Sequence, residues 1–217
     1  MQDYESWNIA GHDLEYLDDI HQYIVDGICV PSITQCLKIR FKNKYATVDA
    51  STLKRASERG TEAHRCIEEW CKEGKESDLP ELRNFKFLKK QYGFEIVSNE
   101  IPVILFKDGE AVCAGRLDLV LRMNDQIGLA DIKRTSTLDK EYLAGQLNLY
   151  RIAYQQCYEQ EIEFLRGVHL RENTRKFVNI PINEKLAWEI ISDWRRKELA
   201  RKIVEDWDER RKSNGNI

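Results

Sequence analysis

The chain has 217 residues, 42% of them hydrophobic, and a formal net charge of −3. This length suffices for one well-buried core but falls short of two ordinary domains, so we expect a single domain over residues 1–217. The small net charge does not by itself indicate a protein that binds nucleic acid. The sequence holds no apolar run long enough to span a membrane, and its first twenty residues lack a basic start followed by an apolar stretch. We therefore expect a soluble cytoplasmic protein with no membrane partner.

Charge is distributed unevenly along the chain. Residues 1–26 hold seven acidic residues and no Lys or Arg, and we treat residues 1–22 as an acidic N-terminal segment. Between positions 38 and 59 the sign reverses, through Lys38, Arg40, Lys42, Lys44, Lys54, Arg55 and Arg59. Such a run is either a patch that faces phosphate groups or an ordinary solvated helix face, and the sequence leaves both interpretations open.

A β-hairpin is predicted near the N-terminus. Residues 23–25 and 28–30 have strand composition, and the Asp26-Gly27 pair between them is a favoured two-residue hairpin turn. Pro31 ends the second strand. Ser32 then offers a good N-cap for a following helix.

Two helices are predicted next. Residues 49–73 are rich in helix formers and are bounded by Asp49 and Gly74, which indicates one long helix with a permissive site at Gly60. A shorter amphipathic helix follows Pro80.

From Phe94 the pattern changes to that of β-strands. Three successive runs joined by tight turns predict an antiparallel meander over residues 94–106, 110–123 and 127–135. After it we expect a helix over 139–158, strands over 162–170 and 176–182, and a long terminal helix opened by Asn183. This order indicates an α/β domain with a mixed central β-sheet flanked by helices.

The terminal helix carries two displaced apolar stripes. Their members are Leu186, Ile190 and Trp194, followed by Leu199, Ile203 and Trp207. Because the Trp residues lie on these stripes, we expect them to pack in the core rather than to stack on bases. The tail over residues 212–217 is expected to be disordered.

The stretch LADIKRT, residues 129–135, places an acid and a base on one side of a strand. Asp131 and Lys133 share a strand face, and Asp118 lies on the preceding antiparallel strand, where it can come beside Asp131. Two adjacent carboxylates repel unless a cation lies between them, and oxygen ligands suit Mg²⁺ or Mn²⁺. Lys133 would then point at whatever the metal binds. The competing interpretation is a salt bridge on a solvated strand face.

Two helical pairs accompany this strand motif. Gly60 and His64 are four residues apart on the long helix, and Gln146 and Tyr150 are four apart on a later one. The ordered set GTEAH, GRLD, DIK and QLNLY resembles the RecB-type nuclease family of the PD-(D/E)XK superfamily. The segment DGICVPSITQCL also looks like the start of small members of that family that phages often encode.

The resemblance implies a restriction-endonuclease-like core and a role for each matching residue. It implies that His64, Asp118, Asp131 and the carbonyl of Ile132 bind Mg²⁺ or Mn²⁺, and that Lys133 is the catalytic lysine. Gln146 and Tyr150 would contact DNA or steady the acidic residues, with an ordinary amphipathic helix as the alternative. Glu100 stands where members of the family carry an acidic residue before the strand motif, and we treat it as a supporting residue of the site. Gly60 would let the substrate approach the helix closely.

The chain departs from the family pattern in several places. Arg134 stands directly after the lysine, where many relatives have Thr, so Arg134 and Thr135 are treated as supporting residues beside the substrate. Six scattered cysteines without a C-x-x-C pair, and none after Cys157, predict reduced structural thiols and no iron–sulfur cluster or cysteine-bound metal. The chain lacks a nucleotide-binding G-x-x-x-x-G-K-[ST] loop, so any helicase activity must come from a partner.

Together these features predict a metal-dependent deoxyribonuclease. The resemblance implies an exonuclease acting on DNA ends in phage or bacterial recombination, repair or DNA metabolism, in the cytoplasm of a bacterial host. A single-strand annealing protein or a helicase would be its partner. The alternatives are a non-catalytic DNA-binding or regulatory protein on a degenerate nuclease fold, and a nuclease module that acts on RNA. Polarity, the choice of metal and the oligomeric state stay open.

Overall fold

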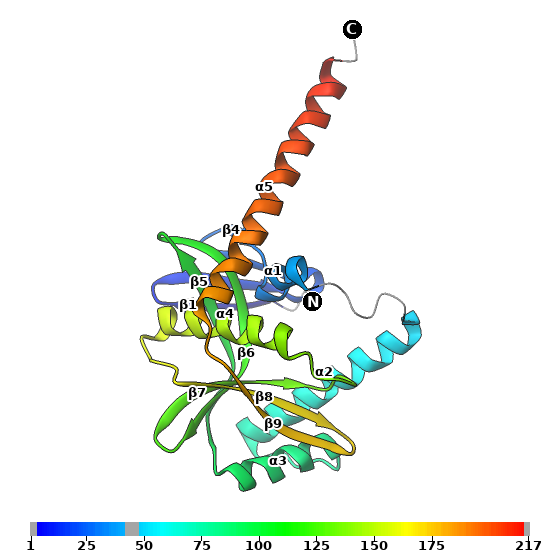
Figure 1. Ribbon diagram of the computed structural model, residues 1–217, viewed down its shortest axis with the longest axis vertical. Helices are drawn as coiled ribbons and strands as arrows, with labels where there is room; N and C mark the ends of the chain where they lie inside the picture. The colour runs from blue at the N-terminus through cyan, green and yellow to red at the C-terminus, as the bar shows by residue number, and fades with distance from the viewer. Residues whose placement is uncertain (1–3, 42–47, 215–217) are drawn as a thin grey trace.

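The computed structural model describes residues 4–41 and 48–214, which form a mixed α/β protein with two β-sheets (Figure 1). The strands are β1 (Tyr4–Ile9), β2 (His12–Leu17), β3 (Gln22–Val25), β4 (Ile28–Val30), β5 (Glu95–Lys107), β6 (Glu110–Met123), β7 (Gln126–Lys133), β8 (Phe164–Arg171) and β9 (Thr174–Ile180). The helices are α1 (Ile33–Arg40), α2 (Ala50–Glu73), α3 (Pro80–Tyr92), α4 (Lys140–Tyr158) and α5 (Glu184–Asn214), with a short 3-10 helix at Asp18–Ile20.

The larger sheet has five strands in the order β5-β6-β7-β8-β9. Its pairs are antiparallel except for β7 and β8, which run parallel because α4 connects them as a crossover. Helix α4 lies across one face of this sheet, and α2 and α3 lie against the other (Figure 1). The mixed sheet flanked by helices is therefore confirmed.

The smaller sheet was expected only in part: β3 and β4 confirm the hairpin predicted over residues 23–25 and 28–30, whereas β1 and β2 were not expected. Strands β1 to β4 form an antiparallel meander in chain order, and the acidic N-terminal segment supplies β1, β2 and the 3-10 helix. Ala10 and Gly11 make the first turn with φ values of 52° and 85°, the left-handed region that tight hairpins require. The backbone N–H of Ala114 donates to the carbonyl of Pro31 at 3.0 Å and ties this sheet to β6.

Local capping signals explain where the helices begin and end. Asp49 accepts a hydrogen bond from the N–H of Thr52 at the start of α2, and Gly74 ends that helix with φ 68°. Ser32 and Gln35 form a capping box at the start of α1. Asn183 accepts from the N–H of Leu186 at the start of α5.

Two hydrophobic clusters sandwich the five-stranded sheet. Side chains alternate across β7, so Leu129 packs into one cluster with α4, while Ala130 and Ile132 pack into the other with α2 and α3. Asp131 and Lys133 have the same parity as Leu129 and lie on the α4 side. The alternation predicted from LADIKRT thus places the acid and the base on one face.

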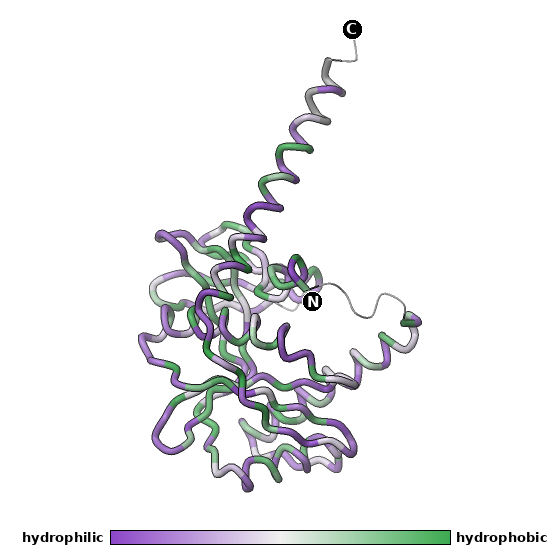
Figure 2. Tube along the Cα trace, viewed as in Figure 1, coloured by the Kyte–Doolittle hydropathy of each residue, from purple (hydrophilic) through white to green (hydrophobic). Residues whose placement is uncertain are grey.

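The terminal helix differs from expectation beyond Trp194. Trp188 and Trp194 pack against the core, but Trp207 is 63% exposed, so the expectation that it packs is wrong. The helix continues to Asn214, so the tail predicted as disordered is helical over 212–214, and 215–217 lie outside the described residues. Figure 2 shows hydrophobic positions recurring along its projecting part.

Three further features concern the helices, the cysteines and the basic run. Within the described residues, the helices are too short or too polar to cross a membrane. All six cysteines are free thiols. Of the basic run, Lys54, Arg55 and Arg59 are exposed on α2, whereas Lys42 and Lys44 lie outside the described residues.

Candidate metal site and cleft

An open cleft of about 620 Å³ lies where the two sheets meet α1, α2 and α4. Most of the predicted site residues line it: Gly60, His64, Glu100, Asp118, Asp131, Lys133, Gln146 and Tyr150. They come from five elements spread over 90 residues of sequence, and the fold brings them together. Ile132, Arg134 and Thr135 are not among the residues that line this cleft.

His64 and Asp118 are held in a fixed relation by the backbone of Ile132. Nε2 of His64 donates to the Ile132 carbonyl at 2.9 Å, because a carbonyl can only accept. The N–H of Ile132 donates to Oδ2 of Asp118 at 2.6 Å. A neutral His64 therefore carries its proton on Nε2 and turns the lone pair of Nδ1 toward Oδ2 of Asp118, 3.6 Å away. Two acceptors that face each other in this way are satisfied either by a proton on Nδ1, which makes an ion pair with Asp118, or by a cation between or beside them.

Glu100 completes this group of donors. One ligand atom each from His64, Glu100 and Asp118 lie within 4.8 Å of one another. Glu100 has φ 52°, which is uncommon for a residue with a side chain and is a form of strain that gathers at functional sites. Burial, and then the carboxylate of Asp118, raise the pKa of Glu100 to about 8, although Arg116 opposes the shift with its Nε 3.1 Å from the carboxylate.

The donor set fits a divalent cation. One imidazole nitrogen and two carboxylates offer the nitrogen and oxygen ligands that Mn²⁺ accepts, and the carboxylates equally suit Mg²⁺. The positive charge would also relieve the repulsion that raises the pKa of Glu100. His64, Glu100 and Asp118 are therefore the residues best placed to hold a metal.

Asp131 and Lys133 form a pair beside this group. Nζ of Lys133 lies 2.5 Å from Oδ2 of Asp131, and Asp131 is only 2% exposed. Burial raises the pKa of Asp131 to about 6, although the Lys133 ammonium opposes the shift. Burial disfavours the charged form of Lys133, but the carboxylates of Asp131 and Asp118 outweigh it and raise the pKa of Lys133, so its ammonium stays charged. Asp131 thus orients Lys133 in the cleft, and its role as a metal ligand stays a prediction.

Gln146 and Tyr150 point from α4 into the same cleft. The Tyr150 hydroxyl donates to the carbonyl of Arg116 at 2.9 Å, and a Cβ at Gly115 would lie 3.0 Å from the Tyr150 ring. Gly115 therefore lets α4 approach β6 closely. Gln146 is 5% exposed, and its Oε1 has no hydrogen-bond partner among the described residues.

The residues after the lysine turn away from the cleft. Nε of Arg134 lies 2.6 Å from Oε1 of Glu81 on α3, and both side chains are largely buried. The Thr135 hydroxyl donates to the carbonyl of Thr137, and its own carbonyl accepts from Nε2 of His169 at 2.7 Å. Arg134 and Thr135 therefore stabilise the end of β7 on the side away from the cleft.

Several cleft residues were missed at the sequence level. Tyr16 and Tyr23 of the N-terminal sheet, with His21 from the connection between β2 and β3, line one part of the cleft, and the Tyr16 hydroxyl lies 2.6 Å from Nδ1 of His21. Arg116 binds Glu5 at 2.9 Å as well as Glu100, and so joins the two sheets. The alternation of Leu14 and Tyr16 could have revealed β2, but no local signal places that strand at the cleft.

Comparison with known proteins assigns no family. No protein-family model matches the chain, and no curated protein matches it. Among solved structures, the chain is similar to one described as "Crystal structure of SSO0001", with 17% sequence identity and a TM-score of 0.43. The similarity covers 76% of this chain and 74% of that chain. At this level it does not identify a fold family or a function.

Proposed function

We propose that the chain is a metal-dependent deoxyribonuclease that hydrolyses phosphodiester bonds in DNA. The observation that carries this proposal is the meeting of two acceptor atoms, Nδ1 of His64 and Oδ2 of Asp118, 3.6 Å apart beside Glu100 and the charged ammonium of Lys133. A cation site next to a fixed positive charge suits a substrate with a phosphate group. The RecB-like order of GTEAH, GRLD, DIK and QLNLY supports the same class.

Each residue of the chain has a distinct task in this proposal. His64, Glu100 and Asp118, with Asp131 as the further ligand that the resemblance implies, would hold Mg²⁺ or Mn²⁺. The bound cation would act as a Lewis acid on the phosphate and lower the pKa of water. Lys133 stabilises negative charge that develops on the phosphate oxygens, and Asp131 holds its ammonium in place. The hydrogen bond from Nε2–H of His64 to the carbonyl of Ile132 leaves the lone pair of Nδ1 free to bind the cation.

The part of the cleft that the N-terminal sheet lines supports action on the end of a DNA strand. Tyr16, His21 and Tyr23 line the cleft together with residues of α2 and α4, so more than one part of the fold bounds it. A flexible single strand or a terminus enters such a cleft more easily than a continuous duplex does. We therefore propose an exonuclease. The resemblance to RecB-type nucleases supports a place in DNA recombination or repair, with a helicase or annealing protein as partner.

Nuclease assays test the proposal directly. Linear and closed circular DNA are incubated with Mg²⁺ or Mn²⁺ and the wild-type chain, Lys133→Ala, Asp118→Ala, or Lys140→Ala as a control on an exposed lysine. We expect wild type and the control to degrade linear DNA, and the other two variants to be at least a hundredfold slower. Activity that survives both substitutions, or no activity in wild type, overturns the catalytic proposal.

The same samples distinguish the alternatives. A non-catalytic DNA-binding protein would retain the DNA without cutting it, in every metal tested. An RNA-directed enzyme would degrade linear RNA and leave DNA intact. Mn²⁺ binding, measured by calorimetry on wild type and on Asp118→Asn, separates loss of the cation from loss of the lysine.

A further inference from the structure

An open hollow, separate from the cleft, lies between α3 and the turn that joins β8 to β9. It has a volume of about 580 Å³ and is lined by Arg83, Asn84 and residues 172–176. Asn84 is only 5% exposed, and its Nδ2 donates to the carbonyls of Arg171 and Glu172 at 2.7 and 3.3 Å. This contact fixes the turn against α3, so the fold sets the positions of the lining residues. We call this site the α3 hollow.

Positive charge gathers around the α3 hollow, although the chain as a whole has a formal net charge of −3. Residues 80–92 and 171–176 together hold seven basic residues and two acidic ones. Of the two acidic residues, Glu81 is buried and paired with Arg134, whereas Glu172 lines the hollow. The hollow is therefore an electropositive surface on a protein whose net charge is negative.

Neighbouring carboxylates do not neutralise the cations of the hollow. Arg83, Arg175 and Lys176 are exposed and make no ion pair with another described residue. Exposed cations elsewhere do pair, as Arg65 and Lys72 do with glutamates one turn away on α2. The three cations are therefore available to an anionic partner.

Arg175 is restrained in a way that suits a phosphate group. Its guanidinium lies 3.7 Å from the centre of the Phe87 ring, which is 44% exposed. Stacking restrains the plane of the guanidinium and leaves the N–H donors at its edge free, and two such donors match a phosphate group. Arg175 can therefore bind phosphate with little further loss of conformational freedom.

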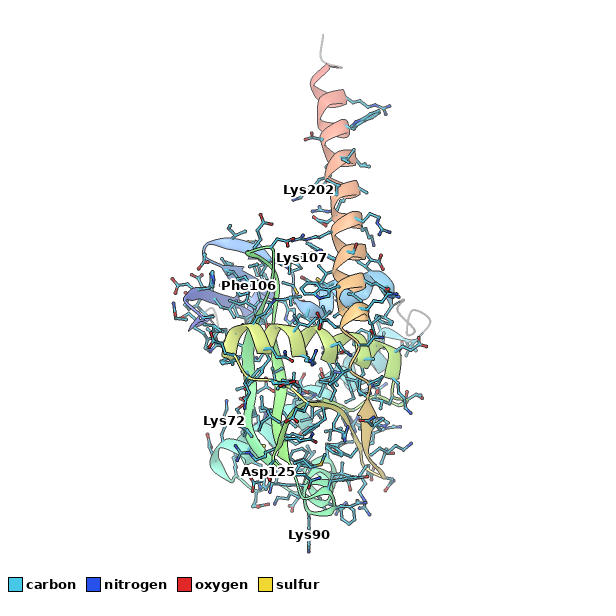
Figure 3. All side chains as sticks on the ribbon, turned by 60° about the vertical axis from the view of Figure 1, so that its left-hand side comes forward. Lys72, Lys90, Phe106, Lys107, Asp125 and Lys202 are labelled. Carbon is cyan, nitrogen blue, oxygen red and sulfur yellow. The ribbon has the colours of Figure 1, made fainter. Side chains whose placement is uncertain are left out.

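The layout of the cations favours a chain of phosphates over one small anion. Arg83 and Lys90 lie on one face of α3, and their separation of seven residues corresponds to about 10 Å along the helix axis. Lys90 points away from the body of the protein at the lower end of the molecule (Figure 3). The positive charge thus follows a line, as the backbone of a nucleic acid does.

The exposed aromatic rings beside these cations are already engaged. Arg175 lies over Phe87, and Tyr92 packs against Phe177 with the ring centres 4.7 Å apart. Single-stranded nucleic acid binds by stacking its bases on open aromatic faces, whereas contacts to a duplex backbone need only cations and other polar donors. The surface therefore suits a duplex better than a single strand.

The α3 hollow lies at the same end of the large sheet as the cleft. Strand β9 is two strands away from β7, which corresponds to about 10 Å. Strand β8 ends two residues past His169, the partner of Lys133 in the pairing of β7 with β8. A nucleic acid whose end lies in the cleft can therefore continue across this end of the sheet to the hollow.

We propose that the α3 hollow is a second nucleic-acid-binding surface, which holds the double-stranded part of a DNA substrate while its single-stranded end occupies the cleft. Arg83, Arg175 and Lys176 contact phosphates of the duplex, so this binding does not depend on base sequence. The choice of DNA rests on the proposed function, whereas the choice of a phosphate backbone rests on the charges of the hollow.

Fluorescence anisotropy in chelator, which prevents metal-dependent cleavage, tests the proposal. The two labelled ligands are a short single strand of DNA and a DNA duplex that carries the same strand as an overhang. Wild type should bind the duplex with overhang roughly tenfold more tightly than the single strand. Arg83→Ala/Arg175→Ala should lose this preference and bind the single strand as wild type does. Its slope of log affinity against log salt on the duplex should fall by about 1.8, because each phosphate contact contributes about 0.9.

Two further variants are the controls. Arg83→Lys/Arg175→Lys keeps both charges and should keep the slope of wild type. Lys197→Ala/Lys202→Ala removes the same charge from exposed positions on α5 and should keep both the slope and the preference for duplex. If Arg83→Ala/Arg175→Ala binds the duplex as wild type does, or if wild type binds both ligands equally, the proposal is wrong. Tighter binding of an RNA duplex with the same overhang would overturn the assignment to DNA.

Cleavage of the single strand with Mn²⁺ separates this inference from the nuclease proposal. If wild type leaves the strand intact but shows the preference for duplex that Arg83→Ala/Arg175→Ala loses, the nuclease proposal fails and the binding surface stands. If wild type cleaves the strand but has no preference for duplex, the binding surface is refuted and the nuclease proposal stands.

Discussion

Glu100 combines two unfavourable features, a buried carboxylate and a left-handed backbone, at the candidate metal site. Its carboxylate is buried beside Asp118, and its backbone has the left-handed φ of 52° within a strand. Both features cost stability, of order 1–3 kcal/mol for such a backbone alone. They are understandable if the carboxylate must reach a cation that His64 and Asp118 share.

The stability of the metal-free protein should fall as the carboxyl of Glu100 ionises. Burial first, and Asp118 second, raise its pKa from 4.5 to about 8. A pKa that is higher in the folded state stabilises the fold while the group is protonated, and this stabilisation is lost as the pH rises from about 4.5 through about 8. With a chelator present, wild type should lose about 1–3 kcal/mol relative to Glu100→Gln between about pH 5 and about pH 8.5 in urea denaturation.

Glu95→Gln provides the control for this measurement. Glu95 lies on the same strand, but its side chain is 70% exposed, so the variant should follow the pH dependence of wild type. Adding Mn²⁺ at about pH 8.5 should stabilise wild type more than Glu100→Gln. Identical pH profiles for wild type and Glu100→Gln would show that the carboxyl of Glu100 ionises normally.

Arg134 should matter for stability rather than for substrate binding. Arg134→Met leaves the carboxylate of Glu81, which is 2% exposed, buried without its partner. Breaking one side of a buried ion pair costs about 3–5 kcal/mol, whereas replacing both sides costs much less. Urea denaturation should therefore show a large loss for Arg134→Met and recovery of most of it in Glu81→Met/Arg134→Met.

The exposed pair of Arg122 and Glu95 serves as the comparison. Its atoms are 3.7 Å apart and its side chains are 50% and 70% exposed, so Arg122→Met should cost no more than about 1 kcal/mol. If Arg134→Met is as mild, the buried pair does not hold β7 to α3.

At the scale of elements, the sequence predicted the features that neighbouring residues determine, namely the ends of helices and the turns between strands. The bounds of α2 follow from Asp49 and Gly74, and the meander follows from alternation and from turns at Asp108-Gly109 and Asn124-Asp125, all with positive φ. Strands β1 and β2 were missed because an acidic segment lacks the β-branched runs that indicate strands. Their stability comes from pairing with β3 and from packing against the larger sheet, which short-range patterns do not encode.

The junction of α4 with α5 depends on one buried side chain. Nδ2 of Asn148 donates to the carbonyls of Ala144 and Pro181, and its Oδ1 accepts from the N–H of Asn183 at 2.6 Å. Asn148→Ala leaves two backbone groups unpaired where α5 begins, which should cost about 2–4 kcal/mol in urea denaturation. The control Asn173→Ala, in the exposed turn between β8 and β9, should change stability by less than about 0.5 kcal/mol.

A smaller loss for Asn148→Ala would mean that water replaces the amide at this junction. Amide exchange at Asn183 distinguishes the two outcomes, because its N–H is protected only while the bond to Asn148 persists. Rapid exchange in the variant with unchanged global stability would limit the role of Asn148 to the first turn of α5.

Across the whole molecule, the cleft depends on contacts between distant segments. The sequence identified His64, Asp118 and Lys133 as separate signals, and their order carried the resemblance. It left open whether Asp131 pairs with Lys133 or binds a metal, and it could not show that the pair would be buried or that Glu100 would join His64 and Asp118. Those relations depend on the register of β5 against β6 and on where α2 packs, both of which are set by the assembled core.

The position of the basic run on α2 bears on its two interpretations, a phosphate-facing patch and a solvated helix face. Helix α2 turns Gly60, His64 and Arg65 toward the cleft, and Lys54, eleven residues before Arg65, lies on the same face. Arg55 and Arg59 lie on the opposite face of the helix. The run is therefore divided between a cleft side and a solvated side of one helix.

If the cleft receives a DNA strand, the two sides should contribute differently to binding. Each phosphate contact contributes about 0.7 to the slope of log affinity against log salt for a single strand. Lys54→Ala/Arg65→Ala should therefore weaken binding and reduce the slope by about 1.4, while Arg55→Ala/Arg59→Ala, with the same loss of charge from the same helix, should leave the slope nearly unchanged. Fluorescence anisotropy of a labelled strand, in chelator to prevent cleavage, measures both slopes. Equal slopes for the two double variants would mean that the basic residues of α2 attract DNA without guiding it along the cleft. The DNA strand would then have to enter the cleft from another side.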